Sequence, residues 1–318
     1  MLERLTSSPR VLFWVPTLIW ASTWHVILYQ LDGVPALNSV AWRFALASVL
    51  LFALVKVRGD AWRIPARWHG WLALTGVVQY SANYWAVYEA ERHIPTGLMA
   101  VLFSLMVFGN ALSGWWMFGQ RVTRRFLLAA SGGVAGVVLI FWPEVLATGA
   151  RPQAALDLGL GLLAVVCACS GNALTLSLSR RGVPLLSMLA HSMGYGAIAL
   201  LAVAGVSGVG WHIGSGAAWW ISLIYLAAIG TVTAFVLYFR LAQTEGPARA
   251  ALTGVMIPPI ALAISAAFEG WVPGALSLVG IAVCLASVYA ATRPAKRVTS
   301  PATLKPLAGV AASAAEPS

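Results

Sequence analysis

The sequence predicts an all-α integral membrane protein, and three observations support that prediction. Hydrophobic residues make up 60% of the 318-residue chain, charged residues make up only 9%, and the mean hydropathy is +0.82. Soluble domains carry about a quarter charged residues, so a chain this apolar has to be solvated by lipid. The apolar runs are continuous rather than alternating, which favours helices over a β-barrel. Each crossing needs about 20 apolar residues, so roughly ten crossings fit into the chain.

The apolar runs predict ten transmembrane helices with short connections. They are expected at residues 11–29, 37–56, 68–89, 94–118, 125–143, 157–179, 183–206, 218–240, 246–268 and 273–291. Residues 1–10 precede the first helix, and residues 293–318 are rich in Pro, Ala and Ser. That composition is typical of disorder, so we expect residues 293–318 to form a disordered tail.

The Lys and Arg residues alternate from one connection to the next. Seventeen of the 20 lie in the N-terminal segment, in every second connection and in the tail. The other connections hold only Arg92 and Arg151, and Arg43 lies within the second expected helix. Basic loops stay in the cytoplasm, so this alternation predicts an even helix number and cytoplasmic N- and C-termini. It also accounts for the net charge of +10 without a nucleic-acid partner.

An internal repeat divides the chain into two halves. Gly33-Val34-Pro35 recurs as Gly182-Val183-Pro184, 149 residues later. We therefore expect a first five-helix repeat over residues 11–149 and a second over residues 150–292. Because five is odd, the second repeat has to enter the membrane from the opposite side. Inverted repeats are typical of transporters that expose a midplane site to each side in turn.

Three motifs carry a family resemblance. They are Trp42-Arg43-Phe44, the block from Ile94-Pro95-Thr96-Gly97 to Gly132–Gly136, and the block from Gly246-Pro247-Ala248 through Pro258-Pro259 to Glu269-Gly270. Over roughly residues 11–292 the chain resembles the EamA-type ten-helix members of the drug/metabolite transporter superfamily. Its Trp- and Tyr-rich helices resemble the YddG-like branch, which exports aromatic and other amino acids. The chain departs from the family at Gln120, where a glutamate is usual.

The resemblance implies a multi-pass carrier in the bacterial inner membrane, a monomer or homodimer, with a small-molecule substrate such as an amino acid. Neither a cofactor nor a metal is expected. Export by alternating access, with the site between the two repeats, is the predicted function. No Asp or Glu lies in the middle third of an expected helix, which favours uncoupled movement over proton coupling.

Alternative functions are a proton-coupled drug efflux carrier, a channel, and a membrane enzyme acting on a lipid-linked substrate. The enzyme is disfavoured because the sequence has no acidic metal cluster and no Gly-rich phosphate loop. The protein is therefore predicted not to be an enzyme.

Polar and aromatic residues at helical spacing are the candidates for the substrate cavity. On the third expected helix, Tyr80, Asn83 and Tyr84 lie near one face. Candidates on other helices of both halves are Trp20, Trp24, Asn110, Asn172, His191, Thr231 and Tyr238. The alternative for each of them is packing between helices.

Three further positions are candidates for charge recognition and gating. Arg43 lies about two turns inside the end of the second helix, where it could bind a substrate carboxylate or hold a gate. Snorkelling or pairing with backbone carbonyls is the alternative for Arg43. Pro258-Pro259 on the ninth helix and Gly109 at the matching place on the fourth are the candidate hinges.

Overall fold

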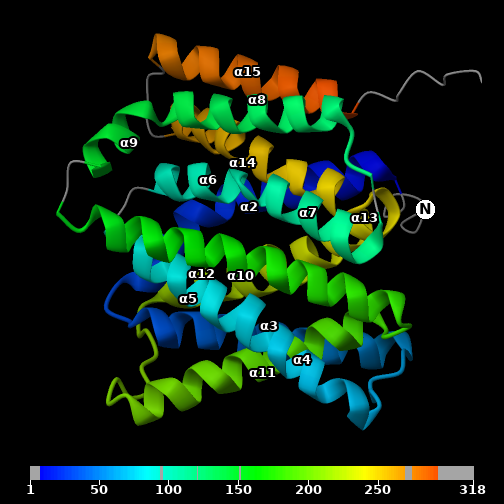
Figure 1. Cartoon of the computed structure of the whole chain (residues 1–318). Helices are drawn as coiled ribbons and strands as arrows, with labels where there is room; N and C mark the ends of the chain where they lie inside the picture. Colours follow the sequence, from blue (N-terminus) through cyan, green and yellow to red (C-terminus); the bar gives the residue numbers. More distant parts are fainter. Residues whose placement is uncertain (1–7, 94–95, 120, 150–151, 269–273, 293–318) are drawn as a thin grey trace, which may run out of the picture.

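The computed structural model describes residues 8–93, 96–119, 121–149, 152–268 and 274–292. Within these ranges the chain is built from helices and short connections, and it contains no strand (Figure 1). The prediction of an all-helical fold is therefore confirmed.

The helices of residues 8–149 follow the predicted order. They are α2 (Pro9–Leu31), α3 (Ala36–Arg58), η1 (Ala66–Trp68), α4 (His69–Thr75), η2 (Gly76–Ala82), α5 (Asn83–Ala90), α6 (Thr96–Ser104), α7 (Met106–Phe118), α8 (Arg124–Ile140) and α9 (Trp142–Gly149). The segments η1, α4, η2 and α5 follow one another without a break and form one long helix. The short helix α9 lies largely beyond the fifth predicted helix.

The helices of residues 152–292 are also close to the predicted positions. They are α10 (Ala154–Arg180), α11 (Leu185–Val206), α12 (Ala217–Ala227), η3 (Ala228–Thr233), α13 (Ala234–Glu245), α14 (Pro247–Phe268) and α15 (Ala275–Thr292). The segments α12, η3 and α13 again form one continuous helix. The ends of these helices differ from the predicted ones by a few residues. The apolar pattern that predicts a helix does not mark the residue at which the helix begins or ends.

Four helices are long and apolar enough to cross a bilayer on their own: Ala36–Arg58, Ala155–Arg180, Leu185–Val206 and Ala217–Glu245. A fifth joins them if Pro9–Thr23 and His25–Leu31, which meet at 41°, count as one bent span. Two further helices, Val101–Met117 and Ala275–Ala291, are apolar but shorter. Ten crossings therefore remain a prediction.

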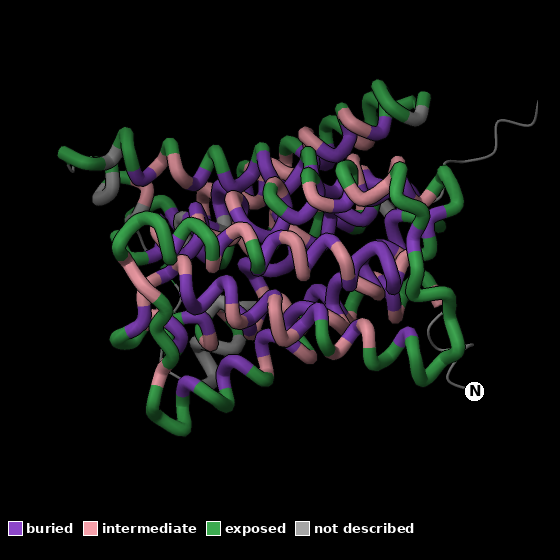
Figure 2. Tube along the Cα trace, turned by 90° about the horizontal axis from the view of Figure 1, so that it is seen from below, coloured by how far each residue is buried: buried purple, intermediate pink, exposed green. Residues whose placement is uncertain are grey.

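The helices form a bundle with two closely packed outer pairs. In Figure 1, α8 and α15 run side by side along one edge, and α11 lies with α3 and α4 along the opposite edge. The helices α2, α10, α13 and α14 lie between these edges. Figure 2 shows buried residues concentrated in the interior and exposed residues around the periphery. Large apolar side chains such as Val206 (87% exposed) and Trp116 (80% exposed) lie at this periphery, as expected of a surface that faces lipid.

Glycines make both outer pairs possible. A Cβ added to Gly280 of α15 would lie 2.6 Å from the carbonyl oxygen of Gly136 on α8. On the opposite edge, a Cβ added to Gly76 of η2 would lie 2.9 Å from the amide nitrogen of Gly196 and would collide with the carbonyl oxygen of Ser192. Small residues at such crossings let helix backbones approach each other closely in a membrane.

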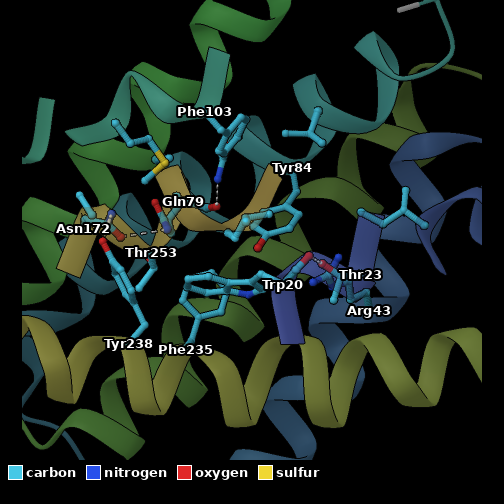
Figure 3. Close-up of a pocket in the computed structure, with 18 residues that line it drawn as sticks. Trp20, Thr23, Arg43, Gln79, Tyr84, Phe103, Asn172, Phe235, Tyr238 and Thr253 are labelled. Atoms are coloured by element: carbon cyan, nitrogen blue, oxygen red, sulfur yellow. Dashed lines mark hydrogen bonds between the residues drawn. The ribbon is translucent and has the colours of Figure 1, made fainter. Parts of the chain in front are cut away.

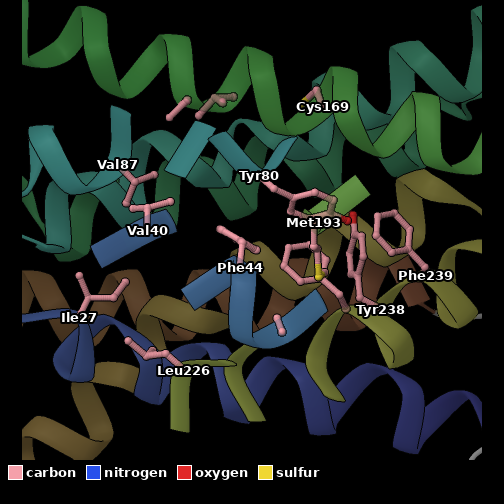
Figure 4. Close-up of a cluster of buried hydrophobic side chains, with 14 of the residues drawn as sticks. Ile27, Val40, Phe44, Tyr80, Val87, Cys169, Met193, Leu226, Tyr238 and Phe239 are labelled. Atoms are coloured by element: carbon pink, nitrogen blue, oxygen red, sulfur yellow. The ribbon is translucent and has the colours of Figure 1, made fainter. Parts of the chain in front are cut away.

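One large cluster of buried hydrophobic residues joins the two halves. It includes Ile27, Phe44 and Tyr80 from the first half and Tyr238 and Phe239 from the second, as Figure 4 shows. Side chains from both halves therefore pack on each other in the middle of the bundle, where the site is expected.

Two long helices contain a π-helical segment, and the two segments share a detail. In η2 the hydroxyl of Ser81 donates to the carbonyl of Gly76 at 3.3 Å. In η3 the hydroxyl of Thr233 donates to the carbonyl of Ala228 at 3.0 Å. Both hydroxyls reach back five residues, so each supplies a donor to the first carbonyl of its segment. Short π-helical segments within α-helices are frequent at functional sites.

Candidate functional site

A central cavity of about 110 Å³ lies between the helices of both halves. Its walls come from α2, α3, η2, α5, α6, α7, α10, α13 and α14 (Figure 3). Within the described part of the chain, α8, α11 and α15 contribute no side chain to it. The cavity therefore lies in the middle of the bundle, between the α8–α15 pair at one edge and α11 at the other.

Six of the predicted residues line this cavity. They are Trp20, Arg43, Asn83, Tyr84, Asn172 and Tyr238. These residues come from five helices that are far apart in the sequence, so the fold brings together groups that the sequence suggested separately.

Three predicted residues lie directly behind the cavity wall. Asn110 accepts a hydrogen bond from Asn172 at 3.3 Å, and Thr231 accepts one from Arg43 at 2.9 Å. Tyr80 is fully buried, and its ring packs against Phe44 at a centroid distance of 5.1 Å. These residues hold the wall in position and do not line the cavity themselves.

His191 lies away from the cavity. Its ring packs against Phe52 of α3 and His69 of α4 at centroid distances of 4.8 and 5.4 Å. Its Nδ1 lies 2.7 Å from the carbonyl oxygen of Ser187. The reason is that α11 packs against α3 and α4, so His191 faces this outer pair instead of the centre. The side chain of Trp24, another predicted residue, lies outside the described part of the structure.

The predicted hinges are placed differently in the two halves. Helix α14 continues without a break through Pro258 and Pro259. The corresponding helix of the first half is interrupted at Leu105, between α6 and α7. Gly109 lies one turn later, and a Cβ there would lie 3.2 Å from the Cβ of Cys169. Gly109 therefore allows close packing of α7 on α10, while the local irregularity falls on Leu105.

Arg43 is the charged side chain of the cavity wall in the described chain, and it is 1% exposed. Its Nε donates to Thr231, its Nη1 donates to the Tyr88 hydroxyl at 3.3 Å, and its guanidinium carbon lies 4.8 Å from the centroid of the Tyr84 ring. Among the described residues no carboxylate lies within ion-pair distance of Arg43. A buried cation with only neutral hydrogen-bond partners is costly, so a carboxylate in the cavity would stabilise it.

Amide side chains form the other polar part of the cavity. Asn172 donates to the hydroxyl of Tyr238 at 3.1 Å and accepts from Nε2 of Gln79 at 3.3 Å. Asn83 donates to the backbone carbonyl of Gln79 at 3.2 Å. The Oδ1 of Asn83 is buried and has no hydrogen-bond partner in the described part of the chain. Buried polar atoms are normally paired, so this oxygen is left available as a hydrogen-bond acceptor.

Aromatic rings separate the two polar regions. Figure 3 shows Arg43 on one side of the cavity and Asn172 with Tyr238 on the other, with Trp20 and Phe235 between them. The Trp20 ring packs on Phe235 and Tyr238 at centroid distances of 5.4 and 5.2 Å. Such a wall suits an apolar group that carries polar ends.

Polar contacts join α2 to the α12–η3 helix beside the cavity. Ser22 and Tyr225 hydroxyls lie 2.6 Å apart. Gln30 donates to the Ser222 hydroxyl at 2.6 Å and to the Trp219 carbonyl at 2.8 Å. These contacts link the two halves beside the cavity.

Several lining residues were not predicted, among them Gln79, Thr253 and Gly254. Gln79 precedes Asn83 by four residues, so the helical spacing could have indicated it. Gly254 precedes Pro258 by four residues. Since proline has no N–H, the Gly254 carbonyl lacks its usual helical donor. The proline pair predicts a hinge with freed carbonyls, and the same missing N–H of Pro258 could also have indicated Gly254.

We expect Tyr238→Phe to lower the thermal stability of the purified protein. The change removes the hydroxyl that accepts from Asn172 and leaves a buried amide N–H with one partner fewer. The expected cost is about 1–2 kcal/mol of unfolding free energy, seen as a lower Tm in detergent. Tyr29→Phe is the matched control, because Tyr29 is 50% exposed, and it should leave the Tm unchanged. An unchanged Tm for Tyr238→Phe would contradict this role of the hydroxyl.

Comparisons with known proteins identify the family. The EamA-like transporter family matches residues 10–142 and again residues 158–293. With a central cavity between these two stretches, the fold is that of a membrane transporter. The chain belongs to the EamA-like transporter family, and the predicted resemblance is confirmed.

Individual relatives are distant but cover most of the chain. The uncharacterised inner membrane transporter YedA of Escherichia coli K12 is 25% identical over 296 residues, which is 89% of this chain and 92% of YedA. A probable terminal-alkyne amino-acid exporter of Streptantibioticus cattleyicolor is 25% identical over 274 residues, covering 86% of this chain and 90% of its own. One crystal structure has a TM-score of 0.72 at 16% identity and covers 90% of this chain and 96% of its own.

These comparisons agree with the predicted class and location. The protein is a multi-pass transporter of the bacterial inner membrane. The family supports a transport role rather than an enzymatic one, with a small molecule as substrate.

Proposed function

We propose that this protein exports amino acids, aromatic ones included, by alternating access around the central cavity. The observation that carries the proposal is Arg43, a cation buried in the cavity wall without a carboxylate partner among the described residues. Guanidinium groups bind carboxylates through two parallel N–H···O hydrogen bonds. The Nε and Nη1 atoms already have partners, which leaves Nη2 and the remaining Nη1 hydrogen for a substrate.

The other groups of the cavity suit the rest of an amino acid. The unpaired Oδ1 of Asn83 and the carbonyl of Gly254 are acceptors for an ammonium group. The rings of Trp20, Tyr84 and Phe235 offer an apolar wall for a side chain. The relative from Streptantibioticus cattleyicolor, a probable amino-acid exporter, supports the same substrate class.

The architecture we propose for transport is ten membrane helices in two inverted repeats, residues 11–149 and 150–292, with both termini in the cytoplasm. The two family matches and the alternation of basic connections support it. The π-helical segments η2 and η3 support it too, since each lies in the third long helix of its half. In this orientation the α2–α12 contacts close the outer side, and the interruption at Leu105, one turn before Gly109, acts with Pro258 and Pro259 as the hinge in opening it.

Coupling is a separate question for this carrier. The sequence favoured uncoupled movement because no carboxylate lies in the middle of a predicted helix. Among the described residues the structure buries two carboxylates, Asp157 of α10, which lies 3.7 Å from His93, and Glu91, just beyond the end of α5. Glu91 follows Tyr88, a hydrogen-bond partner of Arg43, by three residues. The protonation of Glu91 can therefore respond to what binds at Arg43.

Reconstituted protein should exchange L-phenylalanine across liposomes in a saturable manner and show counterflow. Asn83→Ala should raise the KM about tenfold, the equivalent of about 1.4 kcal/mol for one lost acceptor. The matched control is Tyr29→Phe, an exposed side chain, with an unchanged KM. Flux that rises linearly with concentration would contradict the proposal that the protein is a carrier. If phenethylamine is exchanged in a saturable manner and L-phenylalanine is not, the proposal that the substrate bears a carboxylate is overturned.

A further inference from the structure

Glu91 is a buried acid at the end of the cavity helix α5. Its side chain is 8% exposed, and neither carboxylate oxygen has a hydrogen-bond partner in the described chain. Its backbone N–H donates to the carbonyl of Val87 at 2.9 Å, and Val87 lines the cavity. Glu91 therefore lies one helical turn beyond the cavity wall.

Arg43 links this acid to the cavity. Its Nη1 donates to Tyr88, which is three residues before Glu91, while its guanidinium forms part of the cavity wall. The positive charge of Arg43 acts on Glu91 through this low-dielectric region. One cation thus faces both the substrate space and the buried acid.

Other ionisable groups are present on this segment and on the elements packed against it. Besides Arg43, they are Lys56 and Arg58 of α3, Tyr80 of η2, Asp157, Cys167, Cys169 and Arg180 of α10, and Tyr84, Tyr88, Glu89, Arg92 and His93 of the same segment. Glu89 lies 3.8 Å from Arg92, and Asp157 lies 3.7 Å from His93, so these four groups face each other in pairs. The charge that acts on Glu91 is that of Arg43.

The protonation of Glu91 depends on two opposing effects. Burial raises the pKa of Glu91 to about 8, and the charge of Arg43 acts in the opposite direction by favouring the carboxylate. Glu91 therefore titrates near neutral pH, and the balance shifts when the charge of Arg43 is compensated. A substrate carboxylate on Arg43 would compensate it, and Glu91 would then hold a proton more firmly.

We propose that Glu91 takes up a proton from solvent when a substrate carboxylate binds to Arg43, so that the carrier binds each substrate together with one proton. The proposal rests on the proposed function and adds coupling to it. In the step, the Glu91 carboxylate and one solvent proton become the neutral acid, and no other bond changes. A zwitterionic amino acid would then cross with one net positive charge, and the membrane potential would act on its transport.

The first test needs no substrate. Protein labelled with ¹³C at the glutamate carboxyl carbons is titrated by NMR in nanodiscs, and Glu91→Gln identifies the Glu91 signal by its loss. We expect Glu91 to titrate near pH 8 and to move to higher pH in Arg43→Gln, because the stabilising cation is gone. Glu89→Gln is the matched control and should leave the Glu91 signal where it is. Titration of Glu91 at the ordinary value for a carboxyl group, or no response to Arg43→Gln, would overturn the proposal.

The second test counts protons with two probes. Titration calorimetry of L-phenylalanine at pH 8, in buffers of different ionisation enthalpy, should show a net uptake of protons. Phenethylamine, which lacks the carboxylate, should show none. In Glu91→Gln, phenylalanine should still bind but without proton uptake. Above the pKa of Glu91, phenylalanine affinity for the wild-type protein should fall by up to about tenfold per pH unit.

The outcomes separate the two proposals. If phenylalanine binds and Glu91→Gln takes up as many protons as the wild-type protein, the role of Glu91 is overturned and the proposed function stands. If neither probe binds, the proposed function is overturned, and the inference fails with it.

Discussion

Arg43→Gln should reduce the kcat/KM of L-phenylalanine exchange by about a hundredfold to a thousandfold. The change removes the charge that the cavity offers to a carboxylate, and a charged hydrogen bond lost in a dry site costs about 3–4 kcal/mol. Glutamine also cannot restore the paired N–H geometry of a guanidinium. The measurement is counterflow in proteoliposomes, with initial rates taken over a range of substrate concentrations.

Two controls separate recognition from folding. Arg43→Lys keeps the positive charge without the fork of N–H donors, so it should retain an intermediate rate. The Tm of each variant tests the loss of the bonds to Thr231 and Tyr88. Full transport by a folded Arg43→Gln variant would contradict carboxylate recognition by Arg43.

Gly76→Ala should destabilise the protein by up to about 2 kcal/mol, although alanine is normally the better helix former. Overpacking a tight contact costs about 1–3 kcal/mol, while alanine gains about 1 kcal/mol over glycine within a helix. At Gly76 the new methyl group would meet the backbone of α11 at Ser192 and Gly196. Backbone cannot rotate away as a flexible side chain can, so the clash should outweigh the helix-forming gain.

The matched control is Gly159→Ala on α10, where an added Cβ would have no neighbour within 4 Å. That variant should keep or slightly raise the Tm, because only the helix-forming gain applies. The comparison is made by thermal unfolding in the same detergent. Equal behaviour of the two variants would show that the η2–α11 crossing is looser than the structure indicates.

The positions of the helices were predictable because each depends on a local property, the length of an apolar run. The choice between cavity and core was not local. Tyr80 and Tyr84 are one turn apart and look equivalent in sequence, yet only Tyr84 lines the cavity. Tyr80 lies at the crossing with α11, where a Cβ added to Gly196 would come within 3.0 Å of the Tyr80 Cβ. That arrangement depends on tertiary packing, which spacing along one helix does not contain.

Two further differences have the same origin. His191 looked like a cavity residue because it is polar within an apolar helix, but the crossing of α11 over α3 and α4 turns it to their side. Glu91 follows the end of an apolar run, a position typical of a connecting loop. The structure buries it, since the adjoining helices cover the end of α5. Polarity in sequence marked both residues, and only the packing decided what each one faces.

The π-helical segment η2 also makes room for a change of length within a cavity helix. Each residue of an α-helix advances the side chains by about 100° around the axis, and a π-helical turn holds about one residue more than an α-helical turn. Deleting one residue within Gly76–Ala82 would therefore let the segment return to α-helical geometry and keep Asn83, Tyr84 and Val87 directed at the cavity. The same deletion within Asn83–Ala90, which is already α-helical, would turn the residues behind it by about 100°. Natural variation in length among related chains should therefore be more frequent within η2 than within α5.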